Sequence, residues 1–270
     1  MRDLTALLTV AEQAVDAGCG WLARAGAEWS ARSLKPSGEE VTAADVEVER
    51  VVSQVLRRLS PGIPVVGEES ATGRPLPPRC WLLDPIDGTM NFARGAPFHA
   101  VSLAYAEDST PLLGVIDAPA LGRRWRTGAH DGPTRGAPAR ARTVSEAVVG
   151  ITGTGSGEAR LVQRIALLQS AAYRIRMQGA MSLDLVGVAD GWLDACLCLG
   201  PKPWDVAVGT ALARERGKTV LGAGGGEFVL GSPVLVAGEE ALARQILGRW
   251  ESPAAGASPD TAVHRAPERQ

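Results

Sequence analysis

The chain has 270 residues, of which 45% are hydrophobic, so it can form one large domain or two smaller ones that share an interface. Its charges nearly balance, with 28 Lys and Arg against 30 Asp and Glu, so no general positive field favours nucleic acid or an anionic membrane as a partner. No apolar run approaches the roughly 20 residues of a membrane span, and the N-terminus lacks the pattern of a signal peptide. A cytoplasmic enzyme is the simplest interpretation.

The first half of the chain is predicted to contain two helices followed by a mainly antiparallel sheet. Apolar residues recur at helical spacing over 4–29, and a second helix begins at Thr42, where Asp45 three residues later is typical of an N-cap pattern. Residues 33–40 between the helices are interpreted as a loop. Short strands are predicted at 63–66, 81–83, 98–105, 112–116 and 123–126, the last three forming an antiparallel meander.

Strands and helices alternate in the second half of the chain, which argues for a sheet covered by helices. The Gly-, Pro- and Arg-rich residues 131–142 are interpreted as an exposed loop, and we place the boundary near Thr143. The prediction is an N-terminal α+β half (1–142), a C-terminal α/β half (143–251) and a disordered tail (252–270) that lacks large apolar groups. The strands are predicted at 148–151, 173–177, 192–199, 219–221 and 228–236, and the helices at 158–171, 181–189, 204–216 and 239–250.

The four cysteines show no CxxC pair and no His at zinc spacing, so we expect free, buried thiols of the kind found in a reducing compartment. They are Cys19, Cys80, Cys196 and Cys198. The loop 150–157 superficially resembles a nucleotide-binding turn. Glu158 stands where that fingerprint requires Gly, and no Lys follows, so we expect no nucleotide cofactor.

Acids follow two predicted strands at the point where each strand ends. Glu68 and Glu69 come after the strand at 63–66, and Asp84 and Asp87 come after the strand at 81–83. Apolar packing does not tolerate ionised carboxylates close together, so the expected partner is a bound cation. Hard oxygen ligands favour Mg²⁺ over zinc.

A third acid, Asp205, opens the helix predicted at 204–216. A carboxylate also suits the positive end of a helix, and for this residue alone the capping interpretation is favoured. The interpretation of Asp205 as a metal ligand is based on its occurrence together with the other acids.

The segment Asp84-Pro-Ile-Asp-Gly-Thr89, followed by Asn91-Phe92, resembles a motif of the inositol monophosphatase family of Mg²⁺-dependent, Li⁺-sensitive phosphomonoesterases. The resemblance runs from about Leu4 to Trp250. It includes Gly67-Glu-Glu-Ser70, Val41-Thr42 with Asp45, Trp204-Asp-Val-Ala207, and Gly179–Leu185 (GAMSLDL), which is similar to the family's Gly-Ser-Ala-Ala-Leu-Asp-Leu segment. It implies a layered α-β-α-β-α sandwich of the inositol monophosphatase and fructose-1,6-bisphosphatase type, and hydrolysis of a small phosphomonoester.

The resemblance also implies a cluster of two or three Mg²⁺ ions. Asp84 would bridge the ions, and the full ligand set would be Glu68, Asp84, the backbone carbonyl of Ile86, Asp87 and Asp205. Clustered metals of this kind can activate a water, neutralise a phosphate and support a leaving alkoxide, so no covalent nucleophile is required.

Other roles follow from the same resemblance. The amides of Gly88 and Thr89, at a helix start, would cradle the phosphate. Thr89 with Asp45 would orient the attacking water, and Glu69 would support the region of Glu68. Lys35 falls on the family's mobile metal-site loop. Trp204 is expected to buttress the Asp205 turn.

The positions that would touch the alcohol half of the substrate depart from the family. Cys198 stands where inositol phosphatases carry a Glu that binds substrate hydroxyls, and a thiol is a weak acceptor, so inositol phosphate itself is not favoured. Cys198 is expected to line the pocket as a small apolar surface. Ala180 stands where Ser or Thr is common. Lys202 either offers a cation at the pocket rim or is an ordinary solvated loop lysine.

The sequence therefore indicates the reaction more narrowly than it indicates the substrate. We expect a sugar, cyclitol, polyol or nucleoside phosphate, with 3′-phosphoadenosine 5′-phosphate and histidinol phosphate as alternatives. A catalytically silent phosphate-binding protein is the alternative of another class. The resemblance further suggests a homodimer, which no surface pattern of this sequence establishes.

Overall fold

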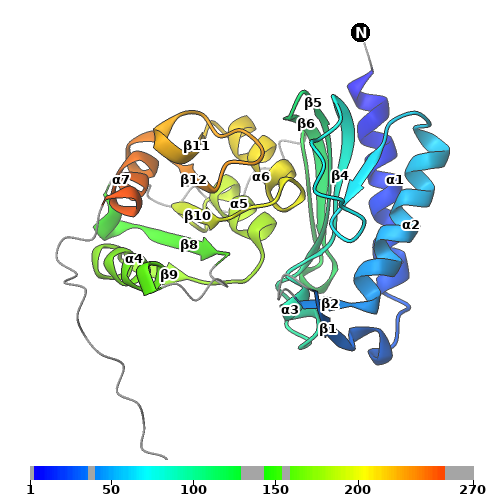
Figure 1. The fold of residues 1–270 in the computed structure, drawn as a ribbon, viewed down its shortest axis with the longest axis horizontal. Coiled ribbons are helices and arrows are strands. Elements are labelled where there is room, and N and C mark those ends of the chain that lie inside the picture. The colour runs from blue at the N-terminus through cyan, green and yellow to red at the C-terminus, as the bar shows by residue number, and fades with distance from the viewer. Residues whose placement is uncertain (1–2, 36–39, 129–142, 154–158, 253–270) are drawn as a thin grey trace, which may run out of the picture.

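The computed structural model describes residues 3–35, 40–128, 143–153 and 159–252, which form two sheets with helices between and outside them (Figure 1). Five expectations lie wholly or partly outside these ranges. They are the middle of the loop at 33–40, the exposed loop at 131–142, the end of the loop 150–157, the first residue of the helix at 158–171, and the tail at 252–270 beyond its first residue.

The N-terminal half is a five-stranded sheet whose outer face is covered by two long helices. The strand order is β3-β4-β5-β6-β7; β3 runs parallel to β4 and the other neighbours are antiparallel, which confirms the predicted meander. The helices are α1 (Leu4–Leu22), α2 (Ala43–Leu59) and α3 (Thr89–Phe92), with 3₁₀ turns at Ala27–Ser30 and Pro119–Leu121. The strands are β3 (Val65–Gly67), β4 (Arg79–Asp87), β5 (Ala100–Glu107), β6 (Thr110–Ala118) and β7 (Arg123–Arg126), beside a ribbon of β1 (Arg32–Leu34) and β2 (Glu40–Thr42).

The C-terminal half is a second five-stranded sheet, in the order β11-β12-β10-β8-β9. Strands β8, β9 and β10 are parallel, whereas β12 is antiparallel to both of its neighbours. The strands are β8 (Val148–Thr152), β9 (Arg174–Arg176), β10 (Ala195–Leu199), β11 (Thr219–Leu221) and β12 (Val234–Gly238). The helices are α4 (Ala159–Ala171), α5 (Met181–Asp190), α6 (Pro203–Glu215) and α7 (Glu240–Glu251), with 3₁₀ turns at Val144–Glu146 and Ala223–Gly225.

Alternation along β4 explains why both faces of the first sheet are buried. Trp81 and Leu83 pack in the core beneath α1 and α2, whereas Cys80 and Leu82 pack on the opposite face with apolar residues of α5 and α6. Successive side chains of a strand point to opposite faces. Asp84 therefore continues the second series and faces the C-terminal half.

Helices α5 and α6 form the middle layer of the molecule, because their apolar residues pack on both sheets. Helices α4 and α7 cover the far face of the second sheet (Figure 1). The order of layers is thus α1/α2, sheet, α5/α6, sheet, α4/α7, which confirms the predicted α-β-α-β-α sandwich. The boundary near Thr143 stays a prediction.

Several element boundaries differ from the sequence-based prediction. The first helix ends at Leu22 instead of Trp29, ahead of Gly26, which has low helix propensity. The last strand begins at Val234 instead of Phe228, because Gly231 has a φ of +96° and Pro233 lacks an N–H for the sheet. The predicted loop at 33–40 contributes to the β1–β2 ribbon.

All four cysteines are free thiols, as predicted; Cys80, Cys196 and Cys198 are buried, and Cys19 is half-buried. Within the described ranges, no helix combines the length and the apolar character that crossing a membrane requires.

Candidate active site

The last residues of β4 carry the central acids into the space between the two sheets. The strand continues to Asp87, and its pairing with β5 shifts register between Asp84 and Asp87. The Asp84 carboxylate accepts a hydrogen bond from the Ile86 N–H at 3.1 Å, within this irregular segment. Both acids are buried, at 2% and 6% exposure. The strand thus turns two ionisable groups into the interior.

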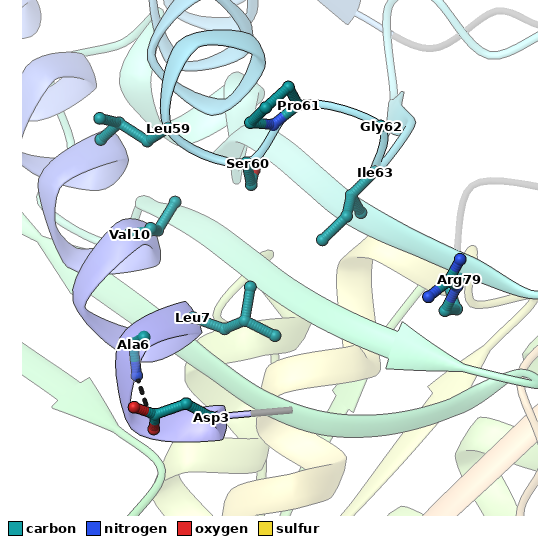
Figure 2. A pocket seen from close by; sticks show the side chains of 10 residues that line it. All are labelled: Asp3, Ala6, Leu7, Val10, Leu59, Ser60, Pro61, Gly62, Ile63 and Arg79. Atoms are coloured by element: carbon teal, nitrogen blue, oxygen red, sulfur yellow. Dashed lines mark hydrogen bonds between the residues drawn. The ribbon is translucent and has the colours of Figure 1, made fainter. Parts of the chain in front are cut away.

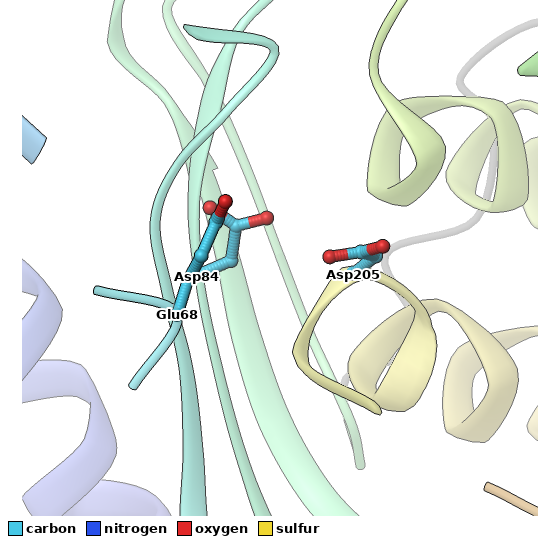
Figure 3. A group of neighbouring side chains, drawn as sticks. All are labelled: Glu68, Asp84 and Asp205. Atoms are coloured by element: carbon cyan, nitrogen blue, oxygen red, sulfur yellow. The ribbon is translucent and has the colours of Figure 1, made fainter. Parts of the chain in front are cut away.

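Three predicted metal ligands converge from distant parts of the chain (Figure 3). Glu68 follows β3, Asp84 lies on β4, and Asp205 lies in the first turn of α6. One carboxylate oxygen of each lies within 4.8 Å of the others. The residues are separated in sequence by as many as 137 positions, from Glu68 to Asp205. The fold therefore brings together acids from both halves.

Asp87 is held differently from these three acids. Its carboxylate accepts hydrogen bonds from the N–H of Met181 at 3.1 Å and from the N–H of Ser182 at 2.8 Å, and also from the Ser182 hydroxyl. Burial raises the pKa of Asp87 to about 7, although the bonds from Ser182 and Met181 oppose this shift. Asp87 thus joins β4 to the start of α5. It lines the same cavity, but it is not one of the three converging acids, so its role as a metal ligand stays a prediction.

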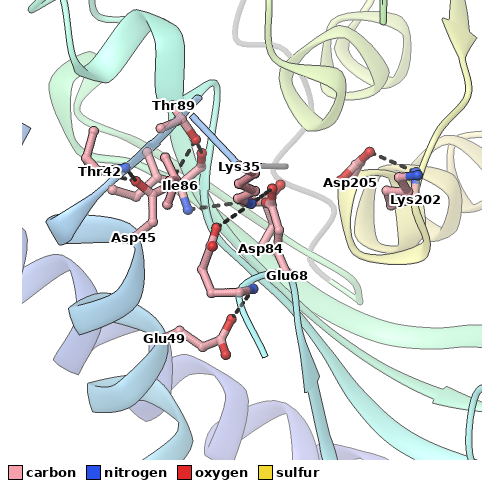
Figure 4. Close-up of polar contacts among 12 residues, drawn as sticks. Lys35, Thr42, Asp45, Glu49, Glu68, Asp84, Ile86, Thr89, Lys202 and Asp205 are labelled. Atoms are coloured by element: carbon pink, nitrogen blue, oxygen red, sulfur yellow. Dashed lines mark hydrogen bonds and ion pairs between the residues drawn. The ribbon is translucent and has the colours of Figure 1, made fainter. Parts of the chain in front are cut away.

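Lys35 bridges the two glutamates that follow β3. Its Nζ lies 2.7 Å from Oε1 of Glu68 and 2.7 Å from Oε1 of Glu69 (Figure 4). Burial lowers the pKa of Lys35, but the hydrogen bonds to both glutamates outweigh this effect and raise it. Burial raises the pKa of Glu69 to about 7 against the opposing effect of Lys35. Glu49 of α2 accepts the N–H of Glu69 at 2.8 Å and so fixes the backbone of this turn.

The N-terminus of α2 holds Asp45 in a fixed orientation. Its Oδ2 accepts hydrogen bonds from the Thr42 N–H at 2.8 Å and from the Thr42 hydroxyl at 2.6 Å, which confirms the predicted capping pattern. The Thr89 hydroxyl lies 3.0 Å from Oδ1 of Asp45 and 3.0 Å from the carbonyl oxygen of Ile86 (Figure 4). Burial raises the pKa of Asp45. The helix cap therefore aligns Asp45 with Thr89, and their role in orienting the attacking water stays a prediction.

A cavity of about 420 Å³ lies beside the converging acids. It contains the three converging acids, Asp87 and the Gly88–Thr89 turn. The described residues that line it are Leu34, Glu68, Asp84, Ile86, Asp87, Gly88, Thr89, Met90, Thr152, Gly153, Gly179, Met181 and Asp205.

The charges in this cavity fit a bound cation. Burial raises the pKa of Asp84 well above its ordinary value, and the neighbouring carboxylates of Glu68, Asp87, Asp205 and Asp45 raise it further. These acids repel one another when ionised, and a divalent cation removes that repulsion. The donor set consists of oxygen atoms, which suits Mg²⁺.

A second cavity, of about 390 Å³, lies between the start of α1 and the end of α2 (Figure 2). Asp3 is the one acid among its described lining residues, and it caps α1 by accepting the N–H groups of Thr5 at 3.0 Å and Ala6 at 3.2 Å. This carboxylate is used in the helix cap, so the second cavity lacks the converging acids of the first.

A family model described as the inositol monophosphatase family matches residues 3–252. The chain belongs to the inositol monophosphatase family. It is therefore a phosphoric monoester hydrolase of a metal-dependent family, and its structure contains an acidic cluster formed by Glu68, Asp84 and Asp205.

Relatives and solved structures agree with this assignment. The chain is 32% identical to the inositol-1-monophosphatase ImpA of Mycolicibacterium smegmatis, over 91% of this chain and 92% of the relative. It is 37% identical to a histidinol-phosphatase of Mycobacterium tuberculosis, over 68% and 74% of the two chains. The structure matches the extragenic suppressor protein suhB of Bartonella henselae with a TM-score of 0.77 at 25% identity, over 90% and 97% of the two chains.

The residues expected to select the substrate lie around the cavity rather than in its wall. Cys198 is fully buried in the core between β10 and the middle helices, where it packs with Cys196 and apolar residues. The expectation that Cys198 lines the pocket is therefore wrong. Ala180 is also fully buried, directly before α5. Lys202 is exposed, and its backbone N–H is capped by Asp205 at 2.8 Å.

Trp204 packs against the core between the first sheet and the middle helices, directly before Asp205. This contact is consistent with the expected support of the Asp205 turn. Its indole Nε1 is buried without a hydrogen-bond partner among the described residues.

The sequence analysis missed two methionines that line the cavity, Met90 and Met181. A signal for one of them was present, because Met181 occupies the third position of GAMSLDL, where the similar family segment has Ala. It also missed Ser182 and Glu49, whose partners are 95 and 20 residues away in sequence.

Proposed function

We propose that this chain is a Mg²⁺-dependent phosphatase that hydrolyses a small phosphomonoester by direct attack of water. The convergence of Glu68, Asp84 and Asp205 in one cavity with the Gly88–Thr89 turn carries this proposal. Glu68, Asp84 and Asp205 would hold the metal together with Asp87 and the carbonyl of Ile86. Mg²⁺ bound there would supply positive charge to the phosphoryl group and lower the pKa of the attacking water.

Thr89 and Asp45 provide a route for the proton of the attacking water. The Thr89 hydroxyl has one hydrogen to donate, toward Asp45 or the Ile86 carbonyl, so its lone pairs can accept a hydrogen bond from water. The buried Asp45 carboxylate, whose pKa is raised by burial, can hold the proton that Thr89 passes on.

The Gly88–Thr89 turn would bind the phosphate through its backbone amides. Gly88 has a φ of +86°, and a Cβ placed on it would lie 2.7 Å from the carbonyl oxygen of Phe98. The sharp turn therefore depends on glycine, which tolerates this backbone conformation.

Replacing Gly88 by Ala is expected to impair both folding and phosphate binding. The positive φ alone costs about 1–2 kcal/mol, and the contact with Phe98 adds to this loss and displaces the turn. Gly62→Ala is the matched control: Gly62 has a φ of +84° but nothing within 4 Å of its Cβ position. Thermal unfolding should show a larger loss for Gly88→Ala, and KM should rise only in that variant. Equal effects of the two substitutions would contradict the role of the turn.

The proposal as a whole is tested by removing and restoring the metal. Phosphate release should be lost in EDTA, return with Mg²⁺, and fall with Li⁺ at millimolar concentration, as the family resemblance suggests. Activity that survives chelation would contradict the mechanism. Binding of Mg²⁺ and phosphate in calorimetry without turnover would instead support a silent phosphate-binding protein.

Hydrolysis of histidinol phosphate is a second candidate, supported by the 37% identity to a histidinol-phosphatase. The inositol-1-monophosphatases among the relatives support an inositol or other cyclitol phosphate. A comparison of kcat/KM for inositol, sugar, histidinol and nucleotide phosphates would separate these. A homodimer and a cytoplasmic location stay predictions.

A further inference from the structure

Among the described residues, the side chains that line the cavity beside the acids and the Gly88–Thr89 turn are mainly apolar. The wall is formed by small and apolar residues from four regions of the chain, which are Leu34, Met90, Thr152, Gly153, Gly179 and Met181. This wall is where the alcohol half of a phosphomonoester would lie when its phosphate is bound at the turn.

Each methionine of the wall lies against a glycine. The Cε atom of Met181 is so close to Gly153 that a Cβ on that glycine would lie 2.8 Å from it. The Cε atom of Met90 would lie 3.7 Å from a Cβ on Gly179. Met181 is 7% exposed, whereas Met90 is 48% exposed. One thioether therefore forms the inner wall, and the other forms the rim directly after Thr89.

The described side chains of the wall offer few hydrogen-bond donors to a polyol. The Thr152 hydroxyl donates to Asp184, a buried carboxylate that also accepts the Gln178 amide at 2.7 Å. Asp184 itself does not line the cavity, nor do Cys198 and Lys202. Among the described lining residues, the carboxylates belong to the proposed metal site. Sugar hydroxyls placed against the side chains of Leu34, Met90 and Met181 would lose hydrogen bonds to water without replacement.

We propose that this cavity selects phosphomonoesters whose alcohol half carries an aromatic ring and few hydroxyl groups. A ring gains apolar contact from both methionines, and thioethers make favourable contacts with aromatic rings. The flexible Met side chain also adapts to the shape of the ring. Met181 and Met90 then determine specificity. This inference rests on the phosphatase function proposed above.

The test compares two esters with similar alkoxide leaving groups, 2-phenylethyl phosphate and myo-inositol 1-phosphate. The wild-type enzyme should have a kcat/KM at least about tenfold higher for the phenylethyl ester, within the range that apolar contacts achieve. Met181→Gln keeps the length of the side chain but adds an amide that can bind hydroxyls. Met181→Gln should lower the ratio of kcat/KM for the phenylethyl ester to kcat/KM for the inositol ester at least about tenfold. Met90→Gln should also lower this ratio.

Met177→Gln is the matched control, because Met177 is 54% exposed and does not line the cavity. Its ratio should stay within about twofold of the wild-type value. Preference of the wild type for the inositol ester, or an unchanged ratio in both Met181→Gln and Met90→Gln, would overturn the inference. If Met181→Gln fails to fold, the inference is tested by the kcat/KM ratio of the two esters in the wild type and in Met90→Gln. Absence of Mg²⁺-dependent hydrolysis of every ester would instead contradict the proposed function.

Discussion

Replacing Asp84 by Asn is expected to abolish phosphate release and to stabilise the metal-free protein by about 1–3 kcal/mol at pH 8. Asp84 is 2% exposed and faces the carboxylates of Glu68, Asp87 and Asp205. Without a cation, its ionised form is buried among like charges. Asn keeps the shape of the side chain and can still accept the Ile86 N–H, but it removes that repulsion.

The stabilisation should depend on pH in a defined direction. Burial and the neighbouring acids raise the pKa of Asp84, so the folded protein holds a proton that the unfolded chain loses near the ordinary pKa of Asp. Wild-type stability without metal therefore falls as pH rises above that ordinary value. The gain from Asp84→Asn should be largest at high pH and should shrink as pH falls.

Added Mg²⁺ should reverse the order of stability. The wild type should gain about 2.7 kcal/mol at a Mg²⁺ concentration of 100 Kd, whereas Asp84→Asn should gain little. Chemical denaturation in EDTA and in Mg²⁺ measures both effects. Loss of stability in metal-free Asp84→Asn would show that the carboxylate has a stabilising partner and would contradict this account.

Asp190 provides the matched control for a buried acid with partners. Its Oδ2 accepts hydrogen bonds from Arg123 at 3.0 Å and from the indole of Trp125 at 2.8 Å. Asp190→Asn weakens a charge-assisted pair and should destabilise the protein with or without Mg²⁺. In the metal-free protein, the free energy of unfolding should rise in Asp84→Asn and fall in Asp190→Asn. This difference distinguishes a buried acid without a compensating charge from a paired one.

The acids that follow β3 and β4 were predictable from local sequence, whereas Asp205, which opens α6, was assigned to the metal site only through the family resemblance, in which it occurs together with the other acids. Hydrophobic runs located β3 and β4, and the acids followed directly. The prediction ended β4 at Leu83, because the apolar run breaks there into the two acids Asp84 and Asp87. The strand continues to Asp87 because its register with β5 shifts after Asp84, which accommodates the irregular segment.

The cavity wall was much less predictable than the acids. Helical periodicity located α5, but the side chain that enters the cavity depends on how this helix packs against β4. That packing involves apolar contacts of α5 with the first sheet and hydrogen bonds from its N-terminus to Asp87, across 94 and 95 residues of sequence. The position of Cys198 was wrongly predicted for a similar reason. Strand alternation placed Cys198 on the same face as Cys196, but whether that face contacts the cavity or the core depends on how the sheet packs.

Replacing Asp205 by Asn is expected to lower kcat/KM at least about a hundredfold without loss of folding stability. Asp205 has two roles in the structure. One carboxylate oxygen caps α6 by accepting the Lys202 N–H at 2.8 Å, and the carboxylate also converges with Glu68 and Asp84. Asn keeps an oxygen for the cap but lacks the negative charge that binds a cation. The substitution therefore separates the capping role from the metal role.

Asp205→Ala completes the comparison, because Ala removes the cap as well as the charge. It should lower the free energy of unfolding by about 0.5–1.5 kcal/mol relative to Asp205→Asn, the net value of the lost hydrogen bond from the Lys202 N–H, with an equal loss of activity. Asp194→Asn is the control: Asp194 accepts the Val148 N–H at 2.8 Å outside the cavity, and its variant should keep turnover within about twofold. Calorimetry should show weaker Mg²⁺ binding in both Asp205 variants. Normal turnover in Asp205→Asn would mean that Asp205 acts as a helix cap alone, and the metal site would then be confined to acids of the N-terminal half.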